Sequence, residues 1–214
     1  MLKLLLIRHG QTLWNKEQRY NGKTDLGLSG YGFRQAERLG QRMQRLPLGH
    51  IVTSGLRRAM ETVQTINAYR TQLLPVSIDQ RWQEIDYGEA EGLRWPEIVQ
   101  RFPQEAQRWA VNDLDARFPG GESLREVAQR VQFALDELIA CHQQERIAVV
   151  AHVGPLRLAL CVLIGLPLQQ HWNFDISACT LSEVAIYPSG TVINLLNDSC
   201  HLRERDRDTA SREA

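Results

Sequence analysis

The stretch Leu4-Leu5-Leu6-Ile7-Arg8-His9-Gly10-Gln11-Thr12 decides how the rest of this chain is interpreted. It begins as an apolar run, and continuous rather than alternating apolar residues are typical of a strand that helices cover on both faces. The run ends on an arginine and a histidine. The sequence therefore predicts a buried strand over residues 2–7 that brings Arg8 and His9 to one end of a sheet.

Two more short apolar runs end in a similar way. Residues 50–53 are followed by Ser54-Gly55 and then Arg58, and residues 147–151 are followed by His152-Val153-Gly154. In an open α/β sheet, ligands bind at the carboxyl ends of the strands, where helix N-termini offer free N–H groups. Guanidinium groups and histidines gathered at such an edge suit an anionic phosphate. We therefore expect a phosphate site formed by four side chains: Arg8, His9, Arg58 and His152.

Helical periodicity fills much of the chain between these runs. Four segments are expected to be helical: one that begins after Ser29, and residues 57–69, 124–141 and 156–164. The third begins with a capping box formed by Ser123 and Glu126. The fourth follows Pro155, and the first turn of a helix tolerates proline because its N–H groups have no partner inside the helix.

The expected fold is of the α/β class. Residues 180–186 and 191–196 flank a turn and predict an antiparallel hairpin. Together with the buried runs, this predicts a three-layer α/β/α sandwich with a mostly parallel sheet and an antiparallel C-terminal hairpin. We expect one domain over residues 1–202, with a lid-like excursion at about 85–120 and a disordered tail over 203–214.

Composition excludes several classes of protein. The chain has 214 residues, with 25 Lys+Arg against 25 Asp+Glu, so its formal net charge is zero. A nucleic-acid binder would carry an excess of basic residues. The longest apolar stretch, residues 156–168, is interrupted by a charge and falls short of the roughly 20 residues that span a bilayer. We expect no nucleic-acid or membrane partner, and a monomer or homodimer.

The N-terminus and the cysteines indicate the cellular compartment. The apolar run at residues 4–7 is shorter than the stretch of about 7–15 apolar residues in a secretory signal. The four cysteines lie about twenty residues apart without a CxxC pair, which fits neither a disulfide framework nor a zinc site. We therefore expect a cytoplasmic protein with free thiols, no bound metal and no cofactor.

The first motif, extended to Trp14-Asn15, closely resembles the RHG motif of the histidine phosphatase (phosphoglycerate-mutase-like) superfamily, branch 1. The resemblance continues, in the family's order and spacing, through residues 19–36, 54–62, 84–92, 119–123 and 150–154. Two departures stand out. Gly27 occupies a position where the family often has proline, and Val153 one where it commonly has glycine. The valine is expected to narrow the mouth of the pocket.

The resemblance implies a mechanism and a role for each site residue. His9 would attack phosphorus as a neutral imidazole, its pKa lowered by Arg8, Arg58 and His152. These groups would also stabilise the charge on the transferring phosphoryl oxygens. Glu84 would protonate the leaving alkoxide and then activate water, with Asp86 and Glu89 as the alternatives. The same resemblance implies phosphate or substrate contacts for three further residues: Asn15, Gly22 and Val153.

The type of reaction and the substrate need a separate argument. Cofactor-dependent phosphoglycerate mutases usually carry a longer, more basic insertion between the acid and the second histidine. Here residues 86–117 are compact, with four arginines and no lysine. Four aromatic residues suggest a partly aromatic lid that suits a bulky or ring-bearing phosphomonoester: Trp95, Phe102, Trp109 and Phe118.

We therefore expect a phosphomonoester hydrolase that acts through a phosphohistidine on a small molecule. The chain also resembles the α-ribazole-5′-phosphate phosphatases, including its Trp172-x-Phe174 stretch, and a broad-specificity phosphatase is an equal alternative. A mutase remains a further alternative. A non-catalytic phosphate-binding module is disfavoured, because such a module would lack one or more of the catalytic side chains. The other four histidines are expected to be structural or solvated: His50, His142, His171 and His201.

Overall fold

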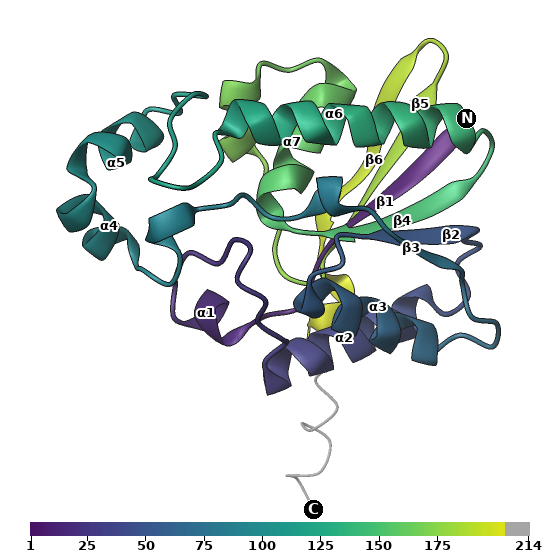
Figure 1. Ribbon diagram of the computed structural model, residues 1–214. Helices are drawn as coiled ribbons and strands as arrows, with labels where there is room; N and C mark the ends of the chain where they lie inside the picture. The colour runs from purple at the N-terminus through teal and green to yellow at the C-terminus, as the bar shows by residue number, and fades with distance from the viewer. Residues whose placement is uncertain (204–214) are drawn as a thin grey trace, which may run out of the picture.

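The computed structural model describes residues 1–203 and contains one six-stranded sheet (Figure 1). The strands lie in the order β3 (Val76–Ile78), β2 (His50–Thr53), β4 (Arg146–Ala151), β1 (Leu2–Arg8), β5 (Leu181–Tyr187) and β6 (Gly190–Asp198). The first four strands in this order pair in parallel. β5 runs antiparallel to β1, and β6 runs antiparallel to β5. The mostly parallel sheet and the C-terminal hairpin are thus confirmed.

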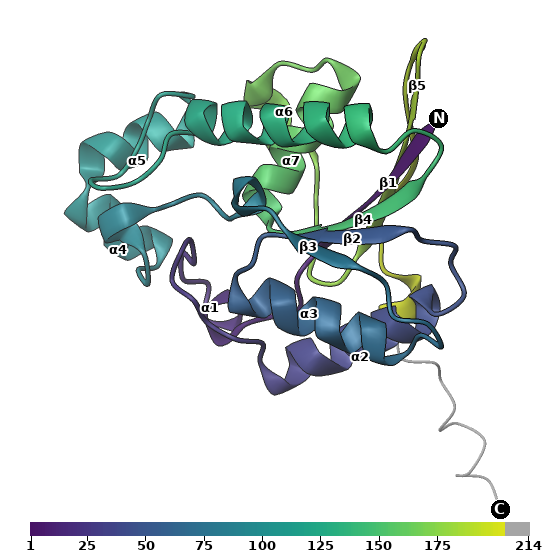
Figure 2. The ribbon, with the colours of Figure 1, turned by 45° about the vertical axis from the view of Figure 1, so that its right-hand side comes forward.

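Helices cover both faces of the sheet (Figures 1 and 2). On one face lie α2 (Gly30–Met43) and α3 (Arg57–Ala68), and on the other α6 (Leu124–Cys141) and α7 (Val153–Ile164). The continuous apolar run of β1 explains this arrangement, because successive side chains of a strand point to opposite faces. Leu4 and Leu6 belong to the core under α6 and α7, whereas Leu5 and Ile7 belong to the core under α2 and α3. The three-layer sandwich is confirmed.

Capping residues predicted from the sequence begin two of the helices, α2 and α6. The side chain of Ser29 accepts a hydrogen bond from the N–H of Gly32 at the start of α2. The Ser123–Glu126 capping box begins α6. α7 begins three residues earlier than the sequence predicts, with Val153, because Pro155 lies inside its first turn.

Several short elements were not predicted from the sequence, among them β3 and the helix α1 (Leu13–Lys16). β3 has only three residues and pairs only with β2, and such a short exposed edge strand has too little apolar content to show in the sequence. The short helix α1 follows β1, and its N-cap Thr12 accepts a hydrogen bond from the N–H of Asn15. This helix brings the asparagine close to the end of β1.

The excursion at about residues 85–120 contains no strand of the sheet. It holds α4 (Trp95–Arg101) and α5 (Pro103–Ala110), which lie away from the sheet at the left of Figure 1. Phe102 and Phe118 point inward and join the core under α6 and α7. The predicted aromatic lid is therefore in part an extension of the hydrophobic core under α6 and α7.

Three further predictions concern the chain as a whole. All four cysteines are free thiols in the structure. Among residues 1–203 no helix is both long and apolar enough to cross a bilayer. The tail predicted over 203–214 lies, apart from Arg203, outside the described residues.

Candidate active site

His9 follows β1 directly and is only 2% exposed. Its backbone N–H donates to the carbonyl of Ala151 at 3.0 Å and so extends the pairing of β1 with β4. The ring Nδ1 lies 2.7 Å from the carbonyl oxygen of Gly10. Because a carbonyl can only accept, Nδ1 carries the proton, and in the neutral ring the lone pair is on Nε2. The structure therefore fixes the tautomer that leaves Nε2 able to attack an electrophile.

His152 follows β4 and is fully buried beside His9, with the two ring centroids 4.9 Å apart. Arg58 donates its Nε–H to Nδ1 of His152 at 3.2 Å. The proton of the neutral ring is therefore on Nε2, which lies 2.8 Å from the hydroxyl of Ser54. Burial, followed by the charge of Arg58, holds the pKa of His152 well below its usual value. Both ring nitrogens are thus engaged by the protein.

Arg58 lies in the first turn of α3 and is fully buried. Its terminal nitrogens donate to the carbonyls of Thr24 at 3.0 Å and Gly22 at 2.6 Å. Burial lowers the pKa of Arg58 to about 10, so the group is still charged at neutral pH. The carboxylate of Glu91 holds the same loop by accepting the N–H of Lys23 at 2.6 Å. Gly22 therefore contributes a carbonyl that orients Arg58.

Glu84 is 4% exposed, and its carboxylate lies at the N-terminus of α7. One oxygen accepts the N–H of Ile85 at 3.0 Å and that of Gly154 at 3.1 Å. A Cβ on Gly154 would collide with this oxygen, so only glycine permits the approach. The two alternative acids lie elsewhere: Asp86 pairs with Lys23 at 3.3 Å, and Glu89 is exposed and pairs with Arg101.

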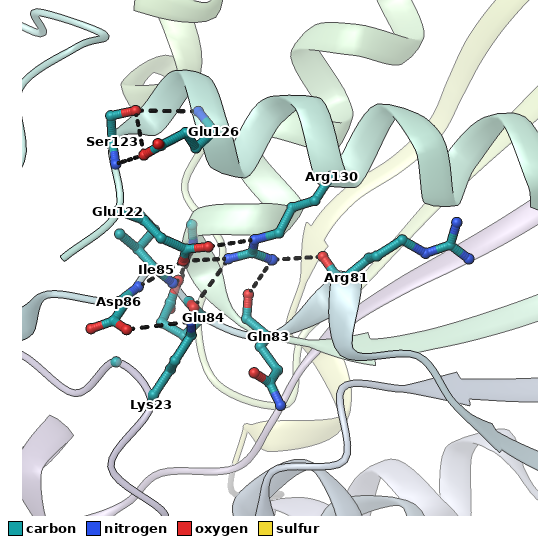
Figure 3. Close-up of polar contacts among 12 residues, drawn as sticks. Lys23, Arg81, Gln83, Glu84, Ile85, Asp86, Glu122, Ser123, Glu126 and Arg130 are labelled. Carbon is teal, nitrogen blue, oxygen red and sulfur yellow. Dashed lines mark hydrogen bonds and ion pairs between the residues drawn. The ribbon is translucent and has the colours of Figure 1, made fainter. Parts of the chain in front are cut away.

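Arg130 of α6 holds the segment that carries Glu84 (Figure 3). Its guanidinium donates to the carbonyls of Arg81 at 2.6 Å, Gln83 at 2.7 Å and Glu84 at 3.1 Å. It also pairs with the carboxylate of Glu122 at 3.1 Å. Sequence reasoning missed this residue, because nothing in the α6 pattern shows which loop an arginine contacts. The planar guanidinium of Arg130, with its several donors, thus holds the backbone at Glu84 in place.

A pocket of about 190 Å³ brings His9 and Glu84 to one space. Of the other predicted site residues, Arg8, Asn15 and Val153 also line it. Arg58, His152 and Gly22 do not line it, and Arg58 and His152 instead form a buried layer beside His9. Arg8 donates from Nη1 to the carbonyl of Ile176 at 3.0 Å, and its buried Nε has no partner among the described residues.

The outer wall of the pocket comes from residues that the sequence did not assign to the site. They include Tyr20, Tyr87, Arg157, His171 and Trp172. The expectation that His171 is only structural or solvated is therefore incomplete: its Nδ1 donates to the carbonyl of Leu168 at 2.9 Å, and the ring lines the pocket. The Trp172-x-Phe174 resemblance was the one signal in the sequence for this wall.

The excursion contributes less to the pocket than the sequence suggests. Of the four aromatic residues predicted to form the lid, only Trp109 lines this pocket, together with Tyr87 of the same excursion. Its four arginines do not line it and instead contact nearby groups: Arg94 donates to a carbonyl, whereas Arg101, Arg108 and Arg117 pair with carboxylates. Aromatic side chains contribute to the site, but arginines of the excursion do not.

The parts assembled here are a buried histidine with a free Nε2, a second neutral histidine, two arginines and a buried carboxyl group. The sequence family described as "Histidine phosphatase superfamily (branch 1)" matches residues 4–199 of the chain. The chain belongs to this superfamily.

Three proteins similar to this histidine phosphatase carry different names, two of them phosphatases and one a mutase. Phosphoserine phosphatase 1 of Hydrogenobacter thermophilus is 35% identical over 95% of this chain and 96% of that protein. A probable phosphoglycerate mutase of Erwinia tasmaniensis is 30% identical over 99% of this chain and 100% of that protein. The crystal structure of a putative α-ribazole-5′-P phosphatase from Escherichia coli superposes with a TM-score of 0.86 at 27% identity, covering 92% of this chain and 96% of that one.

The electrostatics of this histidine phosphatase favour a neutral imidazole at His9 and raise the pKa of Glu84, which lines the same pocket. Burial is the largest cause that holds the pKa of His9 well below its usual value, and the charges of Arg58 and Arg8 act in the same direction. Burial also raises the pKa of Glu84, against the opposing effects of the Ile85 hydrogen bond and the arginines. The direction predicted for the pKa of His9 agrees, but burial contributes more to it than the neighbouring charges on which the sequence argument relied.

Groups able to hold a metal ion are not found in this histidine phosphatase within residues 1–203. No three or more histidine, cysteine, aspartate and glutamate side chains are gathered there in a suitable arrangement. The cations that can face a phosphoryl group in the pocket are those of arginine side chains.

Proposed function

We propose that this histidine phosphatase hydrolyses small-molecule phosphomonoesters through a phosphohistidine on Nε2 of His9, with Glu84 as the general acid and base. The observation that carries this proposal is the pairing in one pocket of a neutral imidazole with its lone pair on Nε2 and a carboxyl group with a raised pKa. The first is the form required of a nucleophile, and the second is the form required of an acid.

The reaction follows in two steps. Nε2 of His9 attacks phosphorus, the bond from phosphorus to the ester oxygen breaks, and Glu84 gives its proton to the leaving alkoxide. In the second step Glu84 takes a proton from water as the water oxygen attacks phosphorus. The bond from phosphorus to Nε2 then breaks, which releases phosphate and restores the imidazole. Arg8 lines the pocket, and its buried Nε has no partner among residues 1–203, so its guanidinium is placed to stabilise charge on the phosphoryl oxygens.

The other predicted site residues take supporting roles in this proposal. Arg58 supplies a buried positive charge beside His9, and the neutral His152, to which it donates a hydrogen bond, packs against the His9 ring. Gly22 orients Arg58 through its carbonyl, and Asn15 and Val153 line the space that the substrate fills. We further propose a cytoplasmic location, which the four free thiols support because oxidising compartments favour disulfides.

The substrate proposed here is a phosphomonoester with a bulky or ring-bearing alcohol. The aromatic wall of the pocket, formed by Tyr20, Tyr87, Trp109 and Trp172, supports a large apolar group next to the ester oxygen. The names of two relatives contain phosphoserine and α-ribazole 5′-phosphate, and of these only α-ribazole 5′-phosphate has a ring-bearing alcohol. A broad-specificity phosphatase would use the same wall with less selectivity.

Activity is expected to be independent of divalent metal ions. Arg8 and the imidazole of His9 perform the functions that a metal ion would otherwise supply, charge stabilisation and a nucleophile. The enzyme should therefore keep its rate of phosphate release from an alkyl phosphate after incubation with EDTA and passage over a chelating resin. A strict requirement for added Mg²⁺ or Zn²⁺ would contradict the proposed site.

Phosphatase activity and mutase activity can be distinguished by their products. If water reaches the phosphohistidine, free phosphate should accumulate without added 2,3-bisphosphoglycerate, and 3-phosphoglycerate should be isomerised slowly at best. Phosphate release across a panel of phosphorylated metabolites and isomerisation of 3-phosphoglycerate are measured on the same preparation. Efficient isomerisation that depends on the bisphosphate would support the mutase alternative instead.

A further inference from the structure

Arg157 is one of three arginines that line the pocket, with Arg8 and Arg19. Arg157 of α7 lies with its guanidinium carbon 4.7 Å from the centre of the Trp172 ring, and its Nε donates to the carbonyl of Phe174 at 2.6 Å. Its two terminal nitrogens have no hydrogen-bond or ion-pair partner among residues 1–203. The guanidinium is therefore held in one orientation while part of its donor capacity stays open.

The other cations at the pocket are already engaged or lie next to His9. Arg19 pairs with Glu17 at 2.8 Å and donates to the carbonyl of Gly92 at 2.7 Å. Arg8 adjoins His9 in the chain and serves the phosphoryl group in the proposed function. Arg157 is thus left as the cation available to the rest of the substrate.

The walls around Arg157 are aromatic and poor in negative charge. A second hollow of about 260 Å³ adjoins the pocket and shares Tyr20, Trp109 and Trp172 with it, adding Trp95. Of the residues that line the two hollows, only Glu84 is acidic. Asp175, the carboxylate whose charge acts most on Arg157, lines neither hollow and accepts a hydrogen bond from Asn197 at 2.9 Å.

We infer that Arg157 is a specificity-determining residue that binds a carboxylate on the alcohol half of the substrate, which lies against the aromatic wall. This inference rests on the proposed function, because it assigns the phosphoryl group to the space between His9 and Glu84. The substrate class is then a phosphomonoester whose alcohol combines a planar apolar frame with a second anionic group. A positively charged group on the alcohol would meet Arg157 without an acidic partner in the outer wall, and would be disfavoured.

The test uses three esters with the same ring and different charge: phenyl phosphate, 3-carboxyphenyl phosphate and 3-(aminomethyl)phenyl phosphate. For the wild-type enzyme we expect kcat/KM to be about tenfold higher for the carboxylate than for the uncharged ester, since a charge-assisted hydrogen bond is stronger than a neutral one. The ammonium ester should be the poorest. Because the carboxylate is bound equally in the ground and transition states, the preference should appear mainly in KM.

Arg157→Gln should lose about tenfold in kcat/KM on the carboxylated ester, by the same hydrogen-bond reasoning, and much less on phenyl phosphate. Arg157→Lys should keep part of the preference, since it retains the charge but not the planar donors. The matched control is Arg108→Gln, which removes an exposed arginine of α5 that pairs with Asp113 outside the pocket. This control should leave kcat/KM unchanged for each of the three esters.

Two outcomes overturn the inference. If Arg157→Gln loses the same factor on all three esters, Arg157 only holds the Phe174 segment in place. If the wild-type enzyme does not prefer the carboxylate, the subsite does not exist. Failure of the proposed function is distinguishable, because it would abolish phosphate release from phenyl phosphate itself. In that case the role of Arg157 can still be tested by calorimetric titration with phenylphosphonate and 3-carboxyphenylphosphonate, which requires no turnover. Equal dissociation constants for the two compounds would contradict that role.

Discussion

Replacement of His9 by alanine is expected to abolish turnover, with a loss of about 10⁴–10⁶-fold for every phosphomonoester, as found when the nucleophile of a covalent mechanism is removed. No other side chain can take its place. The nearest candidate, His152, has Nδ1 engaged by Arg58 and Nε2 next to the hydroxyl of Ser54. Steady-state release of phosphate measures the loss.

The covalent intermediate gives a second readout of the same variant. Rapid acid-free quenching of the wild-type enzyme with a radiolabelled ester should trap a phosphoramidate that is acid-labile and stable in base, and His9→Ala should trap none. His50→Ala is the matched control, because His50 lies on β2, contacts Ser77 and does not line the pocket. It should keep its activity. Label found on His152 in the wild-type enzyme would reverse the roles of the two histidines.

Glu84→Gln is expected to lose about 10²–10⁴-fold on alkyl phosphates, the usual contribution of general acid catalysis. An alkoxide is strongly basic and needs a proton in the transition state, whereas p-nitrophenolate is stable without one. The loss on p-nitrophenyl phosphate should therefore be visibly smaller. Glutamine can still accept the N–H groups of Ile85 and Gly154, so the backbone around it should be preserved.

The pH dependence of the same variant identifies the acid. Burial raises the pKa of Glu84, so its protonated form persists to higher pH than in an exposed glutamate, and the rate on alkyl phosphates should fall as the pH rises through that pKa. This alkaline limb should be absent from Glu84→Gln. Glu89→Gln, which removes an exposed carboxylate paired with Arg101, should leave the profile unchanged. Equal losses on alkyl and p-nitrophenyl esters would point to Asp86 instead.

The sequence by itself determined the frame of the site. The apolar run before Arg8 and His9 is typical of a strand covered on both faces, and residues 147–151 before His152 repeat that pattern. Strands of this kind pair in parallel, so both histidines had to reach the same edge of the sheet. Helix caps such as Ser123 are also local, because the groups that they satisfy lie within one turn.

Tertiary structure alone decided which residues face the substrate and which support them. The contacts of Arg130 with the Glu84 segment, and of Arg58 with the carbonyl of Gly22, join residues 46 and 36 positions apart in the chain. The sequence shows that an arginine lies on a helix, but it does not show whether its guanidinium faces solvent, a backbone carbonyl or a ligand. Arg157 and His171 reach the pocket because the segment after α7 packs against the end of β1, where Arg8 donates to the carbonyl of Ile176 and accepts the N–H of Cys179. Side-chain partners depend on such packing, whereas the order of strands and helices follows from periodicity along the chain.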